Sequence, residues 1–103
     1  MKSIINLAIV ATISFFSIAS MAQNKTADSL TKLAAYFIDH SIPSTYQPKK
    51  ALAFYIQAGN LGNAKAMNAV GMCYKLGLGT GVSSQYAKAW FAKAANAGYT
   101  KAW

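Results

Sequence analysis

Few residues in this sequence could take part in acid–base chemistry. Asp28 and Asp39 are its only two carboxylate side chains. If both lie on one helix, their separation of 11 residues places them about 16 Å apart at a rise of about 1.5 Å per residue. Paired glycosidase carboxylates stand about 5 to 9.5 Å apart, so the two aspartates predict no such catalytic pair.

The chain has one histidine, His40, and one cysteine, Cys73. They cannot form a multidentate metal site alone, because zinc sites use three or four ligands of this kind. A Cys73–His40 dyad is conceivable, but nothing in the spacing favours it. We expect His40 near a helix end, where the helix dipole favours it, and Cys73 as a buried, inert thiol. The sequence thus predicts no catalytic residue, no metal ligand and no cofactor-binding residue.

Residues 77–81 read Gly-Leu-Gly-Thr-Gly and could be mistaken for a phosphate-binding loop. The segment lacks the Gly-Lys-Ser/Thr that follows in such loops, and no strand is predicted before it. Glycine adopts positive φ angles at little cost. We therefore interpret the segment as a tight connection between two helices.

The first 22 residues have the layout of a secretory signal peptide. A positive start at Met1-Lys2 leads into an apolar run over residues 4–18, and small residues precede a predicted cleavage after Ala22. The alternative is an uncleaved membrane anchor, but a span needs about 20 apolar residues and this run is shorter. We expect an exported protein, periplasmic or secreted from a bacterium, with no stable membrane span after cleavage.

The predicted mature part, residues 23–103, keeps nine of the ten lysines and both aspartates, which gives a net charge of +7. It contains no arginine, the residue best suited to forked recognition of phosphates and base edges, so we expect no nucleic-acid partner. The lysines form either a solvated, solubilising surface or an attraction for anionic partners such as acidic proteins.

The second half of the chain contains an internal repeat with an offset of 36 residues. At this offset Gly62 corresponds to Gly98, and the aromatic pair Phe54-Tyr55 corresponds to Trp90-Phe91. A period in the mid-thirties is typical of helix-turn-helix solenoids. Further matched pairs are Ala51 and Ala87, Ala53 and Ala89, Ala58 and Ala94, Asn60 and Asn96, Lys65 and Lys101, and Ala66 and Ala102.

Apolar residues at helical spacing predict a first hairpin of two helices, over about residues 30–39 and 48–58. Asp28 or Ser29 can cap the first helix, and Pro48 suits the first turn of the second. We expect residues 23–27 to be a disordered stub. The predicted apolar face of the first helix consists of Leu30, Leu33, Ala34, Phe37 and Ile38.

A second hairpin is predicted from a helix over residues 64–76, capped by Asn63, and a helix that begins after Ser83 or Ser84 and ends at Gly98. Gly71 has no side chain, so a neighbouring helix can approach it closely. We expect the aromatic residues to form helix–helix core. The predicted core positions here are Ala66, Val70, Cys73, Tyr74, Ala87, Trp90, Phe91, Ala94 and Ala95, with Phe54 and Tyr55 from the first hairpin.

Residues 66–102 resemble a Sel1-like repeat, a relative of the tetratricopeptide repeat. The tetratricopeptide spacing W-x₂-L-G-x₂-Y appears as Met67-x₂-Val70-Gly71-x₂-Tyr74. The signature residues in this sequence are Ala66, Gly71, Tyr74, Gly77, Gly79, Ala87, Trp90, Phe91, Ala94, Gly98 and Ala102.

The resemblance implies an all-α, solenoid-like fold of about one and a half to two repeats. We expect a degenerate first repeat over residues 28–63, a second repeat over 64–99 and the start of an incomplete third over 100–103. Unless something covers it, the last hairpin should then expose apolar side chains, and self-association through this end is possible. The side chains expected to be exposed are Trp90, Phe91, Ala94 and Trp103.

The same resemblance implies an adaptor or scaffold that binds a protein or peptide, acidic in one interpretation, without catalysis. The sequence does not identify the residues that contact the partner. One alternative is a β-lactamase-type or penicillin-binding role, which some exported Sel1-like proteins carry. Those proteins are cysteine-rich, and this chain has one cysteine. The other alternative is a non-functional fragment of a longer repeat array.

Overall fold

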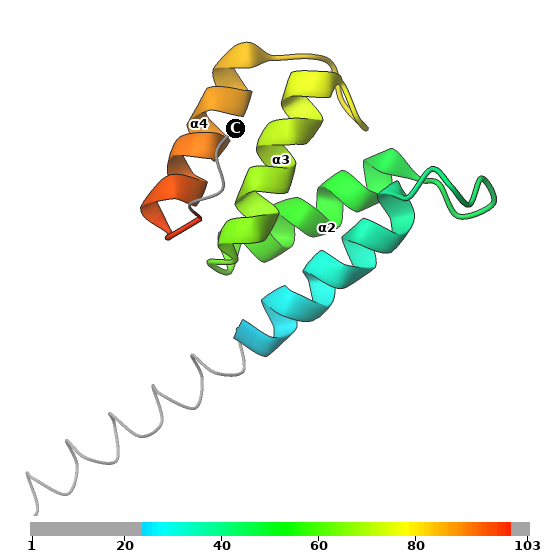
Figure 1. Cartoon of the computed structure of the whole chain (residues 1–103), viewed down its shortest axis with the longest axis horizontal. Coiled ribbons are helices and arrows are strands. Elements are labelled where there is room, and N and C mark those ends of the chain that lie inside the picture. The colour runs from blue at the N-terminus through cyan, green and yellow to red at the C-terminus, as the bar shows by residue number, and fades with distance from the viewer. Residues whose placement is uncertain (1–23, 100–103) are drawn as a thin grey trace, which may run out of the picture.

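The computed structural model describes residues 24–99, which are built from α-helices joined by short turns (Figure 1). An N-terminal helix covers residues 24–38, followed by α2 (Pro48–Asn60), α3 (Ala64–Leu76) and α4 (Ser84–Asn96). These residues contain no strand, so the predicted all-α fold is confirmed. The predicted signal peptide and the predicted start of a third repeat lie outside the described residues.

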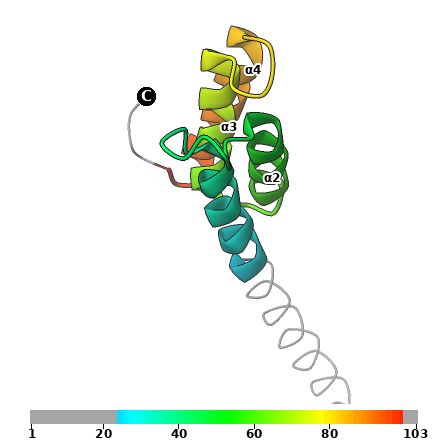
Figure 2. The same ribbon diagram turned by 90° about the vertical axis from the view of Figure 1, so that its right-hand side faces the viewer.

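The four helices form two antiparallel hairpins stacked side by side. The N-terminal helix pairs with α2, and α3 pairs with α4, with α3 lying between α2 and α4 (Figures 1 and 2). Residues of the N-terminal helix, α2 and α3 belong to one hydrophobic cluster. The arrangement is therefore a short solenoid in which α3 joins the two repeats.

The ends of α3 and α4 follow from local hydrogen bonding. The Asn63 side chain accepts a hydrogen bond of 2.8 Å from the backbone N–H of Ala66, and the Ser83 hydroxyl accepts one of 3.3 Å from the N–H of Tyr86. These bonds satisfy backbone donors that a helix start leaves unpaired. The predicted caps Asn63 and Ser83 are thus confirmed, and Gly77 ends α3 in the left-handed conformation.

The core is made largely of alanine, which lets the helix axes approach each other. Apart from alanine, the largest side chains that are fully buried are Val70 and Cys73, both on α3. Close-packed small residues gain many weak dispersion contacts and leave little room for change. The alanines with no exposed surface are Ala34, Ala51, Ala58, Ala66 and Ala94.

The contact between α3 and α4 centres on Gly71. A Cβ atom added there would lie 2.6 Å from the Phe91 ring, so the absence of a side chain is what admits the ring. Phe91 is only 8% exposed and Ala94 is fully buried, so the predicted exposure of these two residues is wrong. The reason is that α4 packs its apolar face on α3 of its own hairpin. Trp90 is partly buried, and Trp103 lies outside the described residues.

The N-terminal helix differs from its prediction. Residues 24–27 are helical rather than disordered, and Ala27 is 2% exposed. Because the helix extends before residue 28, Asp28 and Ser29 lie inside it and do not cap its start. The buried face passes through Thr31, whose hydroxyl donates a hydrogen bond of 2.8 Å to the Ala27 carbonyl.

Two residues assigned to apolar faces lie elsewhere. Leu33 is 41% exposed, because the buried face of the N-terminal helix follows Ala27, Thr31 and Ala34 instead. Ala95 on α4 is also exposed. In both cases apolar spacing alone left the width of the buried face undetermined.

The connection between α3 and α4 packs against the first repeat. Gly79 has a φ of 74°, and a Cβ atom added to it would lie 2.5 Å from the carbonyl oxygen of Pro48. Leu78, its neighbour, packs against the hydrophobic cluster. The glycine-rich segment is therefore a connection between helices, as interpreted, and it also joins the two repeats.

We predict that Gly79→Ala destabilises the protein more than Gly62→Ala does. Both glycines have positive φ, but a Cβ atom at Gly62 would meet nothing within 4 Å. Gly62→Ala should cost about 1–2 kcal/mol from backbone strain alone. Gly79→Ala should cost about 1–3 kcal/mol more, because the new atom meets backbone that cannot rotate away. Urea unfolding followed by circular dichroism measures both; equal costs would contradict the contact with Pro48.

Candidate functional site

The two aspartates are exposed and make separate interactions. Asp28 forms an ion pair of 3.6 Å with Lys32. Asp39 accepts hydrogen bonds from the Ser41 hydroxyl at 2.6 Å and the Ser41 backbone N–H at 3.0 Å, and these bonds lower the pKa of Asp39. A general acid needs a raised pKa, and the shift at Asp39 is in the opposite direction. His40 lies two residues beyond the N-terminal helix, and its ring makes a T-shaped contact with the Tyr46 ring.

Cys73 is buried in the middle of the core, with 1% of its surface exposed. Burial raises the pKa of its thiol from 9.0 to about 11. Burial likewise raises the pKa of Tyr55, with a smaller contribution from the charge of Cys73. The thiol stays protonated at neutral pH and is a weak nucleophile. Within residues 24–99, no group of three or more histidine, cysteine or acidic residues could hold a metal ion.

We predict that Cys73 makes the fold sensitive to alkaline pH. Above pH 9 the thiol ionises in the unfolded chain, while in the folded chain it keeps its proton until about pH 11. The unfolded state thus loses protons first, and the free energy of unfolding falls between these two values. Urea unfolding at pH 8, 9 and 10.5 measures this loss against Cys73→Ala. If Cys73→Ala loses stability with rising pH as steeply as the native chain does, the ionisation of Cys73 is not the cause of the loss.

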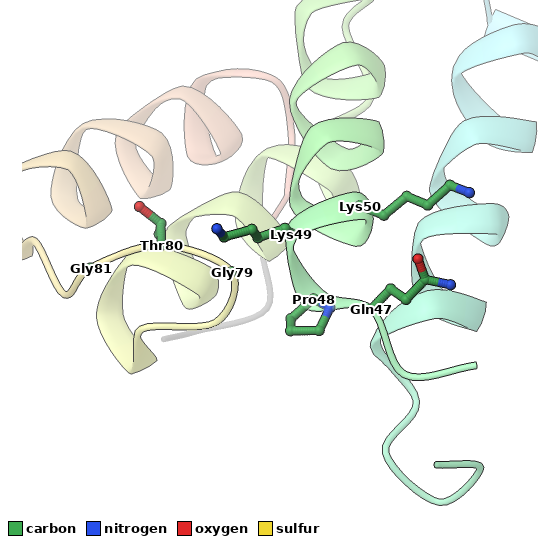
Figure 3. Close-up of a pocket in the computed structure, with 7 residues that line it drawn as sticks. All are labelled: Gln47, Pro48, Lys49, Lys50, Gly79, Thr80 and Gly81. Carbon is green, nitrogen blue, oxygen red and sulfur yellow. The ribbon is translucent and has the colours of Figure 1, made fainter. Parts of the chain in front are cut away.

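An open hollow lies where the α3–α4 connection meets the first turn of α2 (Figure 3). Lys49 extends toward the side of Thr80, whereas Lys50 extends toward the N-terminal helix. There the Lys50 ammonium lies 4.7 Å from the centre of the Phe37 ring. The two charges do not converge on a common point, so this hollow does not form a phosphate cradle.

A groove of about 340 Å³ runs along α3, and we call it the α3 groove. Its α3 residues are spaced three and four apart, so they share one face of the helix. The side-chain oxygen of Asn68 is buried there and has no hydrogen-bond partner among the described residues. The groove is lined by Ile38, Tyr55, Lys65, Asn68, Ala69, Met72, Cys73, Leu76, Leu78 and Tyr99.

A smaller hollow of about 270 Å³ lies between the end of α3 and the start of α4, and we call it the α4 hollow. Its floor is apolar, and a lysine from each helix borders it. Val82 beside it is 71% exposed. The α4 hollow is lined by Lys75, Val82, Ser84, Ala87, Lys88 and Phe91.

The signature residues hold the fold together and do not line the α3 groove. They occupy the core and the turns, as at Ala66, Gly71 and Gly77, while Ala102 lies outside the described residues. The residues that do line the groove on α3 include Asn68 and Met72, which the sequence analysis did not single out. Their helical spacing beside the buried stripe was the available signal.

These stacked pairs of antiparallel helices define the chain as a helical-hairpin repeat protein. The family model of the Sel1 repeat matches residues 27–63 and 64–99, the same two hairpins that the structure shows. The chain therefore belongs to the Sel1 repeat family, as its signature residues indicated. No curated protein and no solved structure matches it in the corresponding comparisons. Among the described residues, no helix has the length and apolarity that crossing a membrane requires.

Proposed function

We propose that this protein is an exported, non-catalytic adaptor that binds a protein partner in the α3 groove. Sel1 repeats generally mediate protein–protein interaction. The observation that carries the assignment to this groove is the Asn68 side-chain oxygen, a buried acceptor without a donor. Such acceptors are rare in folded proteins, because an unpaired buried polar group costs about 1–3 kcal/mol.

The groove offers a chemistry suited to a peptide segment. Ala69, Met72 and Leu76 give an apolar surface, and methionine adapts its shape to different side chains. A backbone N–H or hydroxyl of the partner can supply the donor to Asn68 once its amide rotates. Exposed Lys65 adds a positive charge on the same face. The volume of the α3 groove, about 340 Å³, is at the low end of the range for ligand pockets, about 300–1,000 Å³. A groove of this size suits a few side chains of a partner.

Export and the lack of catalysis rest on separate observations. The first 22 residues have the order of charge, apolar run and small residues typical of a secretory signal. The carboxylates are exposed and apart, and the one cysteine keeps its proton. We therefore place the adaptor in the periplasm or outside the cell, without an active site of its own.

We predict that Leu76→Lys weakens partner binding about tenfold or more, while Leu33→Lys leaves it unchanged. Both leucines are partly exposed, at 57% and 41%, so both variants should fold. Only Leu76 lines the α3 groove, and it contributes apolar area to the complex. Affinity capture from the envelope fraction followed by titration with the captured partner measures the difference. Equal capture by both variants would place the partner elsewhere on the surface.

We predict that Asn68→Leu stabilises the free protein and weakens its complex. Removing a buried acceptor that has no donor should raise the free energy of unfolding by about 1–2 kcal/mol. The same change removes the Asn68 side-chain oxygen, which we propose accepts a hydrogen bond from the partner. Exposed Asn60 provides the control variant Asn60→Leu. Urea unfolding and binding of the captured partner are measured together; a less stable Asn68→Leu variant would contradict the account.

A further inference from the structure

We propose that the α4 hollow is a second docking site, for an acidic segment of another protein that inserts an apolar side chain. This site is separate from the α3 groove and has a different chemistry. It would let the protein hold two partners at once. The internal repeat supports this assignment, because the first repeat shows how the corresponding surface is packed.

The four residues of the α4 hollow that lie on α4 have counterparts 36 positions earlier, on α2. In that repeat the surface is covered. Leu52 and Tyr55 are each 7% exposed, and the backbone of Gly79 lies against Pro48. The corresponding pairs are Pro48 and Ser84, Ala51 and Ala87, Leu52 and Lys88, and Tyr55 and Phe91.

In the second repeat this surface is open only in part within the described residues, since Phe91 and Ala87 are buried like their counterparts, at 8% and 3% exposed. Lys88 is exposed where Leu52 is buried, and Ser84 is exposed where Pro48 is partly covered. Val82 beside them is 71% exposed, the highest value among the large apolar side chains of residues 24–99. The first repeat indicates that this face of a hairpin accommodates a chain segment packed across it.

The two lysines of the α4 hollow determine the charge that a segment packed over the hollow must carry. Lys75 and Lys88 border the hollow, and neither forms an ion pair within residues 24–99. Both aspartates lie before α2, so no acidic side chain comes from α3 or α4. Covering a lysine without pairing its charge costs several kcal/mol. An occupant that packs on Val82 must therefore bring carboxylates to the lysines.

A second copy of this chain is poorly suited to supply those carboxylates. The chain carries ten lysines and two aspartates, a formal net charge of +8. Asp28 is already paired with Lys32, and Asp39 accepts hydrogen bonds from Ser41. We therefore assign the hollow to an acidic segment of a different protein.

The test is selection of random displayed peptides on the full chain, expressed with its own N-terminus and purified as the cell processes it. The most enriched peptide is then synthesised with a fluorescent label and titrated against variants by anisotropy. We expect enriched peptides to combine an apolar residue with neighbouring Asp or Glu. Binding should weaken about tenfold for Lys88→Glu, which turns attraction into repulsion, and should weaken as salt rises.

Lys49→Glu is the matched control, since it changes the net charge equally on exposed α2 surface. It should change the affinity less than about twofold. Val82→Asp tests the apolar contact and should abolish binding, with circular dichroism confirming that each variant is folded. Leu76→Lys in the α3 groove should leave this peptide bound. A failure of the proposed function at the α3 groove is therefore distinguishable from a failure of the second site at the α4 hollow.

Three results would overturn the proposal. Enrichment of peptides without acidic residues would remove the charge argument. Equal loss of affinity in Lys49→Glu and Lys88→Glu would show attraction to the overall positive charge. Sedimentation showing a dimer of the native chain that Val82→Asp dissociates would make a second copy the occupant.

Discussion

The contact on which the structure depends is the close approach of α3 to the helices on either side of it. On one side Gly71 admits the Phe91 ring, and on the other Gly59 of α2 lies against Met67 and Trp90. Alanines without exposed surface fill the same interfaces, so these interfaces depend on small residues. Because residues 24–99 bury so few large side chains, this part of the chain gains its stability from close packing over short distances. The rest of the fold, including the α3 groove and the α4 hollow, follows from the position that these contacts give α3.

This dependence separates most of the residues that define the family from those that we propose bind a partner. Most signature positions are small or buried because the hairpins must stack, and none of those described lines the α3 groove. The side chains of the α3 groove lie on a second face of the same helix. On that face Asn68 and Met72 are only partly buried, so they have surface to offer the partner that we propose.

Much of the fold was predictable from the sequence, because repeat spacing and helix caps are local signals. Asn63 and Ser83 mark helix starts by their own hydrogen bonds, and the bounds of α3 were predicted without error. Long-range packing was less predictable. The burial of Phe91 depends on α3, and the exposure of Leu33 depends on which face α2 covers. The α3 groove was not predictable, since the missing donor at Asn68 appears only when its neighbours are placed.

The contact between Gly79 and Pro48 has a mechanical consequence. The second hairpin is held to the first at two separated points, through α3 and through its connecting loop. With two points of attachment, the hairpin resists pivoting about the α2–α3 junction. For the binding that we propose in the α3 groove, the width of the groove is then set in advance, and association loses little entropy in ordering its walls. Weakening the contact between Gly79 and Pro48 would let the second hairpin move relative to the first, although no residue that lines the α3 groove has changed.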